Sequence, residues 1–210
     1  MTELYANCLL PRVIDLVMRN KDAARLRAEW IPKARGDVLE LGIGSGLNLR
    51  FYSSEVKRVY GVDPSTKLQE MARARAEKIS FDVEFLTQSA EEMLPLDPRS
   101  IDTVVVTWSL CSIPNPSRAL AQVKRVLKAE GRVIFLEHGR AADPGVVVWQ
   151  DRITPIWKRI GGGCHLNRQV DSLIREAGFR ISELTTGYLP GPRPMTYTYR
   201  GFAQLSPGAA

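Results

Sequence analysis

The sequence has few cysteines and no long run of apolar residues. Its three cysteines, Cys8, Cys111 and Cys164, make neither a disulfide framework nor a CxxC metal pattern, so we expect a cytoplasmic protein without a bound metal. The apolar stretch near the N-terminus is interrupted by proline and charged residues between positions 11 and 15. It is too short and too charged to predict a membrane span, and it lacks the order of a signal peptide.

The charge is basic but dispersed. A net charge of +6 would suit a nucleic acid or an anionic membrane, yet the 29 lysines and arginines are spread along the 210 residues, as on an ordinary solvated surface. The length fits one domain whose core needs no disulfides or metals. We therefore expect no nucleic-acid partner and leave open a peripheral membrane contact. The sequence carries no indication of oligomeric state.

Short apolar runs alternate with helix-like segments from residue 37 onward. Strands are expected at residues 37–44, 58–64, 83–89, 101–109 and 131–139, and helices from Leu47 onward, at 66–77 and at 117–127. A further helix at 168–179 is closed by Gly178, and two strands at 181–188 and 195–205 form an antiparallel pair at the sheet edge. This alternation predicts βαβ units, a parallel sheet and helices on both faces.

Two segments stand outside the alternation and are expected to cover the ligand-binding ends of the strands. The first is helical and lies at residues 4–33. The second, at 141–168, contains an apolar stripe made of Trp149, Ile153, Ile156, Trp157 and Ile160. Core packing is the favoured interpretation of that stripe, and the wall of an acceptor pocket is the alternative. Thr154-Pro155 is expected to kink or restart the helix.

The chemistry begins with a glycine loop between the first strand and its helix. Gly42, Gly44 and Gly46 follow Glu40 in the order E-x-G-x-G-x-G, which differs from the G-x-G-x-x-G pattern of nicotinamide and flavin sites. Asp63 ends the second strand 17 residues after Gly46, where a carboxylate can accept hydrogen bonds from both ribose hydroxyls. Together the two features predict a nucleoside-containing cofactor.

At these residues the sequence resembles the class I S-adenosylmethionine-dependent methyltransferases over most of its length. The resemblance implies an α/β, Rossmann-like fold with a seven-stranded, mostly parallel sheet, helices on both faces and one antiparallel edge strand. It implies S-adenosyl-L-methionine as cofactor and S-adenosyl-L-homocysteine as product. The expected domain has a helical lid at 1–33, a cofactor-binding core at 34–140, a helical insertion over the active site at 141–168 and the rest of the sheet at 169–206.

The resemblance also assigns residues to the cofactor. It places Gly42, Gly44 and Gly46 around the methionine part, Glu40 near its ammonium, Asp63 and the adjoining Pro64 at the ribose, and Ser89 and Ala90 at the adenine. Many members have Asp-Ala at the adenine position, so Ser89 is a departure from the pattern. Thr107 and Trp108 are expected to line the cleft near the methyl donor, with Trp108 among the catalytic residues.

A closer resemblance, over residues 34 to 200, is to the thiol methyltransferase-like branch. It is carried by the run VVVTWSLCSI at 104–113, by Glu137-His138 and Trp149-Gln150, and by the segments at 155–158 and 161–168. The branch includes membrane-associated alkyl-thiol S-methyltransferases of animals. Their long N-terminal apolar anchor is missing from this sequence, so we expect soluble behaviour and a small-molecule acceptor, with a thiol as the first choice.

His138 is the candidate catalytic base because it follows the fifth strand at the ligand-binding edge; the alternative is a histidine bonded to loop backbone. The expected acceptor pocket consists of Cys111, Trp149, Trp157, Cys164, His165 and Arg168. The glycines of GGGCHLNR, residues 161–168, are interpreted as a tight return into the domain, and Asn167 as a helix N-cap. Arg168 is expected to tie the lid to the core or to meet a polar end of the substrate.

Other functions remain open at this level. A phospholipid or other amine could be methylated at a membrane surface, or a small metabolite could be methylated on oxygen. A nucleic-acid methyltransferase is disfavoured, because the fourth strand ends in Thr107-Trp108-Ser109-Leu110 instead of the Asn/Asp-Pro-Pro-aromatic signature. A cofactor-binding module without catalysis would also need the glycine loop and Asp63.

Overall fold

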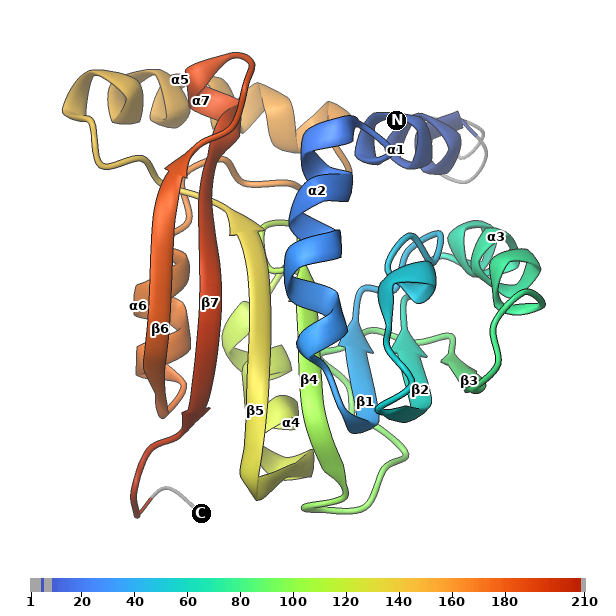
Figure 1. Cartoon of the computed structure of the whole chain (residues 1–210). Helices are drawn as coiled ribbons and strands as arrows, with labels where there is room; N and C mark the ends of the chain where they lie inside the picture. The colour runs from blue at the N-terminus through green and yellow to red at the C-terminus, as the bar shows by residue number, and fades with distance from the viewer. Residues whose placement is uncertain (1–4, 6–8, 209–210) are drawn as a thin grey trace.

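A computed structural model describes Tyr5 and residues 9–208 of the chain (Figure 1). Seven strands form one sheet in the order β3-β2-β1-β4-β5-β7-β6. They are β1 (Gly36–Leu41), β2 (Val56–Val62), β3 (Asp82–Leu86), β4 (Ile101–Thr107), β5 (Leu127–His138), β6 (Phe179–Tyr188) and β7 (Tyr197–Leu205). The main helices are α1 (Leu10–Met18), α2 (Lys21–Trp30), α3 (Thr66–Ala76), α4 (Pro116–Val126), α5 (Pro144–Ile160), α6 (Val170–Glu176) and α7 (Arg193–Thr196).

The sheet confirms the predicted α/β fold. β1 to β5 pair in parallel, and β7 runs antiparallel to both of its neighbours, β5 and β6. The single antiparallel strand therefore lies one place in from the edge, and β6 points in the same direction as the parallel strands. All parallel strands end at the same side of the sheet, which is the upper side in Figure 1.

Helices cover both faces of the sheet. On one face, Leu26 and Trp30 of α2 pack with Val38, Val105 and Ile134 of the strands. On the other face, α4 and α6 pack against the sheet through their apolar sides. The contributing residues of α4 and α6 are Ala119, Leu120, Val123, Val126, Val170 and Ile174. The two helix layers bury the sheet on both sides, as its continuous apolar strands require.

Most of the expected helices are present, and two of them begin at a side-chain cap. The side chains of Ser65 and Asn115 accept hydrogen bonds from backbone N–H groups at the starts of α3 and α4. The helix predicted from Leu47 onward is wrong: the chain forms turns and a short 3-10 helix, Leu49–Phe51. Few residues separate the glycine loop from β2, and within them the Asn48 amide bonds to Glu40 and Thr107 and fixes the path.

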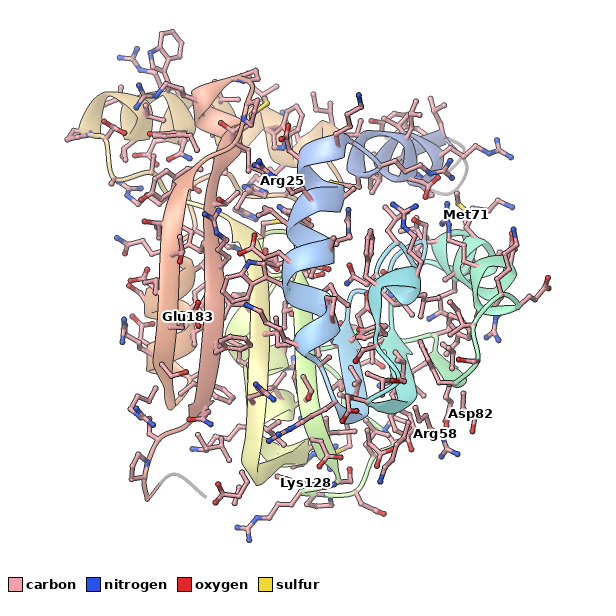
Figure 2. The ribbon with its side chains drawn as sticks, viewed as in Figure 1. Arg25, Arg58, Met71, Asp82, Lys128 and Glu183 are labelled. Atoms are coloured by element: carbon pink, nitrogen blue, oxygen red, sulfur yellow. The ribbon has the colours of Figure 1, made fainter. Side chains whose placement is uncertain are left out.

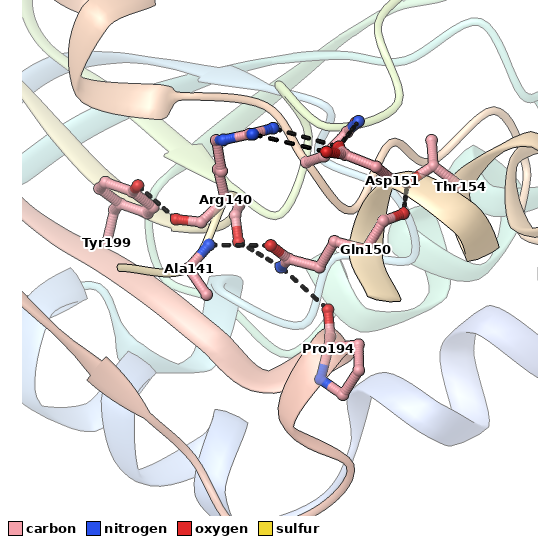
Figure 3. A network of polar contacts seen from close by, with 9 residues as sticks. Arg140, Ala141, Gln150, Asp151, Thr154, Pro194 and Tyr199 are labelled. Carbon is pink, nitrogen blue, oxygen red and sulfur yellow. Dashed lines mark hydrogen bonds and ion pairs between the residues drawn. The ribbon is translucent and has the colours of Figure 1, made fainter. Parts of the chain in front are cut away.

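α5 runs through Pro155 as a single helix, so the predicted restart does not occur. The core-packing interpretation of its apolar stripe is also wrong, because Trp149 is 57 % and Ile156 is 66 % exposed. The helix instead buries Gln150 and Thr154. The loop backbone beneath them has polar groups that need hydrogen-bond partners. The Gln150 amide provides these partners: it accepts from Ala141 N–H and donates to the Gly139 and Pro194 carbonyls (Figure 3).

α1 and α5 lie across the side of the sheet where the parallel strands end, whereas α2 runs along a face (Figure 1). α1 is fixed to α3 by Asp15, whose buried carboxylate accepts from Arg75 at 2.9 Å. The expected N-terminal lid is thus helical over its described part; residues 1–4 and 6–8, with Cys8, lie outside the described residues. Among the described helices, none is both long and apolar enough to cross a bilayer.

Candidate functional site

The glycine loop connects β1 with the 3-10 turn and runs close to two other segments. Its first N–H groups, of Gly42 and Ile43, donate to the Val62 carbonyl at the end of β2. Gly42 and Gly46 have φ values of 71° and 77°, and a Cβ on Gly46 would lie 3.0 Å from the Cα of Ala72. Side chains are therefore excluded at Gly42 and Gly46, which leaves backbone there that a ligand can approach closely.

Asp63 fastens the loop to the end of β2. Its Oδ2 accepts from Gly44 N–H at 3.0 Å and its Oδ1 accepts from Ser65 N–H at 2.8 Å. Burial raises the pKa of this carboxyl, and the two backbone hydrogen bonds oppose that shift. A carboxylate has about four acceptor positions, so each oxygen of Asp63 keeps capacity for another donor. Two such positions fit the vicinal hydroxyls of a ribose.

Glu40 is fully buried at the end of β1. Its two oxygens accept from Asn48 Nδ2 at 2.8 Å and Tyr52 OH at 2.7 Å. Burial raises the pKa of Glu40 to about 7, against the hydrogen bonds and the positive charge of Arg27. Asn48 also accepts from Arg27 Nε at 2.9 Å and donates to Thr107 Oγ1 at 2.9 Å. A polar network thus joins the ends of β1 and β4 beneath the loop.

Trp108 leaves β4 in an uncommon backbone conformation. Its φ is 50°, which costs energy for a bulky residue, and its N–H donates to the Leu136 carbonyl at 2.8 Å. The Arg27 guanidinium lies 4.8 Å from the centroid of its ring. Such conformations concentrate at functional sites. Thr107, Trp108 and the Glu40 network therefore meet at the strand ends.

Glu137 carries part of the resemblance, but no role was predicted for it. It is fully buried in β5, and its Oε1 accepts from the N–H groups of Ser109 at 2.7 Å and Leu110 at 3.1 Å, while Oε2 has no partner in the described part of the chain. Burial raises the pKa of Glu137 to about 8. This carboxyl shapes the segment that follows β4. A glutamate within the apolar run RVIFLEH was the available signal.

His138, Cys111 and Cys164 come together beside this carboxyl. His138 Nε2 lies 3.0 Å from Cys164 Sγ, and one ligand atom from each of the three residues lies within 4.8 Å of the others. Trp157 Nε1 donates to Cys164 Sγ at 3.3 Å. A hydrogen bond from the Cys164 thiol holds the pKa of Cys111 well below its usual range. The predicted pocket residues Cys111, Trp157 and Cys164 thus surround the predicted base.

The loop after α5 lies across the segment after β4. His165 N–H donates to the Cys111 carbonyl at 2.8 Å, and its ring Nδ1 lies 3.3 Å from the same oxygen. Arg168 donates to the Leu110, Ile113 and Pro114 carbonyls, which ties the insertion to the core, one of its two expected roles. Asn167 is not a helix cap as predicted: it donates to Asp151 at 2.7 Å, and Gln169 precedes α6 without a side-chain cap.

The remaining predicted residues lie apart from this cluster. Pro64 follows Asp63 at the end of β2, and Ser89 and Ala90 follow β3, where Ser89 Oγ accepts from Glu91 N–H at 3.2 Å. Trp149 is exposed two helical turns before Trp157, near Arg152 instead of near the thiols. The structure therefore groups Trp157 with the site and leaves Trp149 on the surface.

Comparisons with known proteins agree with this geometry. A family model described as a methyltransferase domain matches residues 39–135. A curated relative is 32 % identical over 177 residues, which cover 80 % of this chain and 71 % of the relative. The chain belongs to the S-adenosylmethionine-dependent methyltransferases.

That relative is the thiol S-methyltransferase TMT1A of Homo sapiens. The thiol S-methyltransferase TMT1B of Rattus norvegicus is 37 % identical over 158 residues, which are 74 % of this chain and 64 % of the relative's length. Among solved structures, the methyltransferase bound to the Haloferax volcanii Trm112 methyltransferase activator superposes with a TM-score of 0.70 at 18 % identity, over 96 % of both chains. The fold is thus that of known methyltransferases.

Proposed function

We propose that the protein transfers a methyl group from S-adenosyl-L-methionine to the sulfur of a small, apolar thiol. The observation that carries the proposal is the joining of two half-sites at one side of the sheet. The glycine loop with Asp63 forms the cofactor half, and the cysteine–histidine cluster after β4 and β5 forms the acceptor half. The thiol S-methyltransferases among the relatives support a sulfur acceptor.

The residues fit the proposed cofactor. Asp63 would hold the ribose hydroxyls through the free acceptor positions of its two oxygens, and the Gly42–Gly46 backbone would follow the methionine part. Glu40 would act near the ammonium through the Asn48 and Tyr52 network, because its carboxyl is fully buried. Ser89 and Ala90 would lie along the adenine. When bound, the cofactor supplies an electrophilic methyl carbon on a sulfonium sulfur.

Methyl transfer is an in-line displacement, so positioning and exclusion of water can provide much of the acceleration. A thiolate is the reacting form of a thiol and is accessible near neutral pH. His138 is the proposed catalytic residue and Trp108 a neighbour that shapes the cleft. We expect His138→Ala to lower turnover while donor binding stays nearly unchanged; equal turnover at every pH would contradict the role.

The decisive experiment is a methyl-transfer assay with radiolabelled donor over thiols, amines, phenols and lipids. Labelled thioether from small alkyl thiols is the expected product. Transfer to amines or phenols but not to thiols would replace the proposed acceptor, and failure with every class would leave only donor binding. We also propose a cytoplasmic location, because the two described cysteines form no disulfide.

Amine methylation at a membrane surface is a second candidate, favoured by exposed apolar residues on α1 and α5. These residues are Leu9, Val13, Leu16, Val17, Val148, Trp149, Ile156 and Ile160. Exposed basic residues, Arg12, Arg19, Arg152, Lys158 and Arg159, accompany them. Both helices lie at the same end of the molecule (Figure 1). Such a surface suits an interface with anionic lipid.

Co-sedimentation with vesicles tests this second candidate. Binding to phosphatidylserine-containing vesicles, weakened by Leu16→Asp and Ile156→Asp and absent with phosphatidylcholine alone, is the expected result. Equal amounts of protein in the supernatant with and without anionic vesicles would rule out the surface as a membrane contact.

A further inference from the structure

Two thiols and an imidazole converge where β4 and β5 end and the loop after α5 crosses them. Each of Cys111, His138 and Cys164 offers a ligand atom within 4.8 Å of the other two. We propose that these residues bind one Zn²⁺ ion and that its fourth coordination position takes the acceptor thiol. The second half of this proposal rests on the proposed thiol methylation, whereas the metal site stands on the geometry alone.

The donor set matches zinc in type and number. Zinc prefers thiolate and imidazole ligands in a tetrahedron, and catalytic sites keep three protein ligands and an open fourth position. With Zn–S of about 2.3 Å and Zn–N of about 2.1 Å, neighbouring ligand atoms lie roughly 3.6–3.8 Å apart. His138 Nε2 and Cys164 Sγ are now 3.0 Å apart, so they need to separate by only about half an ångström. Cys164 directly follows the three glycines of its loop.

The surroundings provide the outer contacts of a thiolate site. Trp157 Nε1 donates a hydrogen bond to Cys164 Sγ, as N–H groups do to metal-bound sulfur. Cys111 is 3 % exposed, while His138 and Cys164 are half-buried, so the cluster has a closed side and an accessible side. We therefore place the approach of an exogenous sulfur on the side of His138 and Cys164.

Two buried polar atoms beside the cluster have no partner among the described residues. They are Glu137 Oε2 and His138 Nδ1. A divalent ion would balance the charge of the two thiolates that bind it. The nearby Arg168 guanidinium is committed to three backbone carbonyls.

The chemistry balances without a further reactant. Zinc binding replaces the S–H bonds of Cys111 and Cys164 by Zn–S bonds and releases two protons to solvent, while His138 binds through the Nε2 lone pair and keeps its proton on Nδ1. An acceptor thiol then loses its proton to solvent and binds as a thiolate. In the transfer its sulfur forms the new S–CH₃ bond as the donor's S–CH₃ bond breaks. The neutral thioether is a weaker ligand and departs.

In this arrangement His138 is a metal ligand and not a base, and metal content distinguishes the two roles. The full chain is expressed with added zinc, dialysed against metal-free buffer to remove loosely bound ions and analysed by mass spectrometry for metals. We expect about one zinc per chain in the unsubstituted protein and below about a tenth in Cys111→Ser, Cys164→Ser and His138→Asn. His165→Asn removes the neighbouring imidazole, which is not part of the cluster, and should keep the metal.

Cobalt provides a measurement that does not depend on variants folding. Co²⁺ in the unsubstituted protein should give the thiolate charge-transfer and ligand-field bands of a tetrahedral site, and ethanethiol, but not ethanol, should shift them. Absence of zinc and of cobalt bands in the unsubstituted protein would overturn the site. Bands that ethanethiol leaves unchanged would overturn the fourth-position assignment. Metal-free protein that methylates thiols at full rate would refute the zinc proposal and leave the proposed function intact. Zinc-bound protein that methylates no thiol would refute the proposed function and leave the zinc site intact.

Discussion

Asp63→Ala is the most direct test of the cofactor half of the site. The Asp63 carboxylate already accepts from Gly44 N–H and Ser65 N–H, one on each oxygen, and retains an acceptor position on each for a ribose hydroxyl. The substitution removes the hydrogen bonds that fasten the glycine loop, and with them the two proposed ribose contacts. We therefore expect this variant to lose both cofactor affinity and the ordered conformation of the glycine loop.

The magnitude follows from two hydrogen bonds to an ionised group. Each contributes about 1.5–3 kcal/mol, so the loss is about 3–6 kcal/mol, or roughly a 10²- to 10⁴-fold increase in Kd. Two N–H groups near the loop also lose their acceptor, so stability should fall by about 1–3 kcal/mol. Asp63→Asn should lose nearly as much affinity, because its amide presents a donor where the backbone already donates.

Calorimetric titration with S-adenosyl-L-homocysteine measures the effect, and circular dichroism confirms that the variant is folded. Asp82→Ala is the matched control: its carboxylate is exposed at the start of β3 and pairs with Arg58 (Figure 2). The control should bind with unchanged affinity. A folded Asp63→Ala protein whose Kd lies within about threefold of the original would refute the ribose assignment.

The other predictions concern the buried polar groups. Burial raises the pKa of Glu40 from 4.5 to about 7, so the native state keeps a proton that the unfolded chain has lost, and stability falls as pH rises between these values. Glu40→Gln should remove about 3 kcal/mol of the loss in unfolding free energy between pH 5 and pH 8, which chemical denaturation at these two pH values would measure. An unchanged loss would contradict the raised pKa of Glu40. Gln150→Leu should cost about 2–4 kcal/mol and several degrees of Tm because it leaves three backbone groups unpaired, whereas Trp149→Leu on the exposed side should change stability by less than about 0.5 kcal/mol. Arg168→Ala should destabilise by about 2–3 kcal/mol through its lost carbonyl contacts, and the exposed Arg159→Ala should not; equal melting temperatures for these two variants would show that Arg168 does not hold the loop.

Hydrophobic periodicity predicted the strands that are buried on both faces and the helix that is buried on one side. The continuous apolar runs of β1, β4 and β5 and the one-sided face of α4 match the two faces of a covered sheet. α5 does not bury its apolar side, because the groups beneath it are backbone donors and acceptors that need a polar side chain such as Gln150 as partner. The apolar stripe of a helix does not indicate whether the backbone beneath the helix needs such a partner. The stripe was therefore predicted to face the core, although it is exposed.

Some residues of the site could also be predicted from the sequence, and others could not. Asp63 and the glycine loop were predictable because chemistry fixes their spacing along a βαβ unit. Cys111, His138 and Cys164 lie on three segments whose meeting depends on how the insertion folds back, so their separation along the chain matched no metal pattern. Asn48 and Tyr52 were missed because a single polar residue after a turn has many uses, and only the buried Glu40 carboxylate gives these two their purpose.

The place of β7 in the sheet has a consequence for how the protein is made. β7 pairs with β5 on one side and β6 on the other, although both precede it in the chain. Until residues 197–205 are available, β6 has no strand to pair with and the outer edge of β5 is open. A chain at that stage exposes an unpaired edge, the feature that invites association between molecules. Insertion of β7 closes both gaps at once, so a chain truncated before residue 197 should associate with other chains in a way that the chain containing residues 197–205 does not.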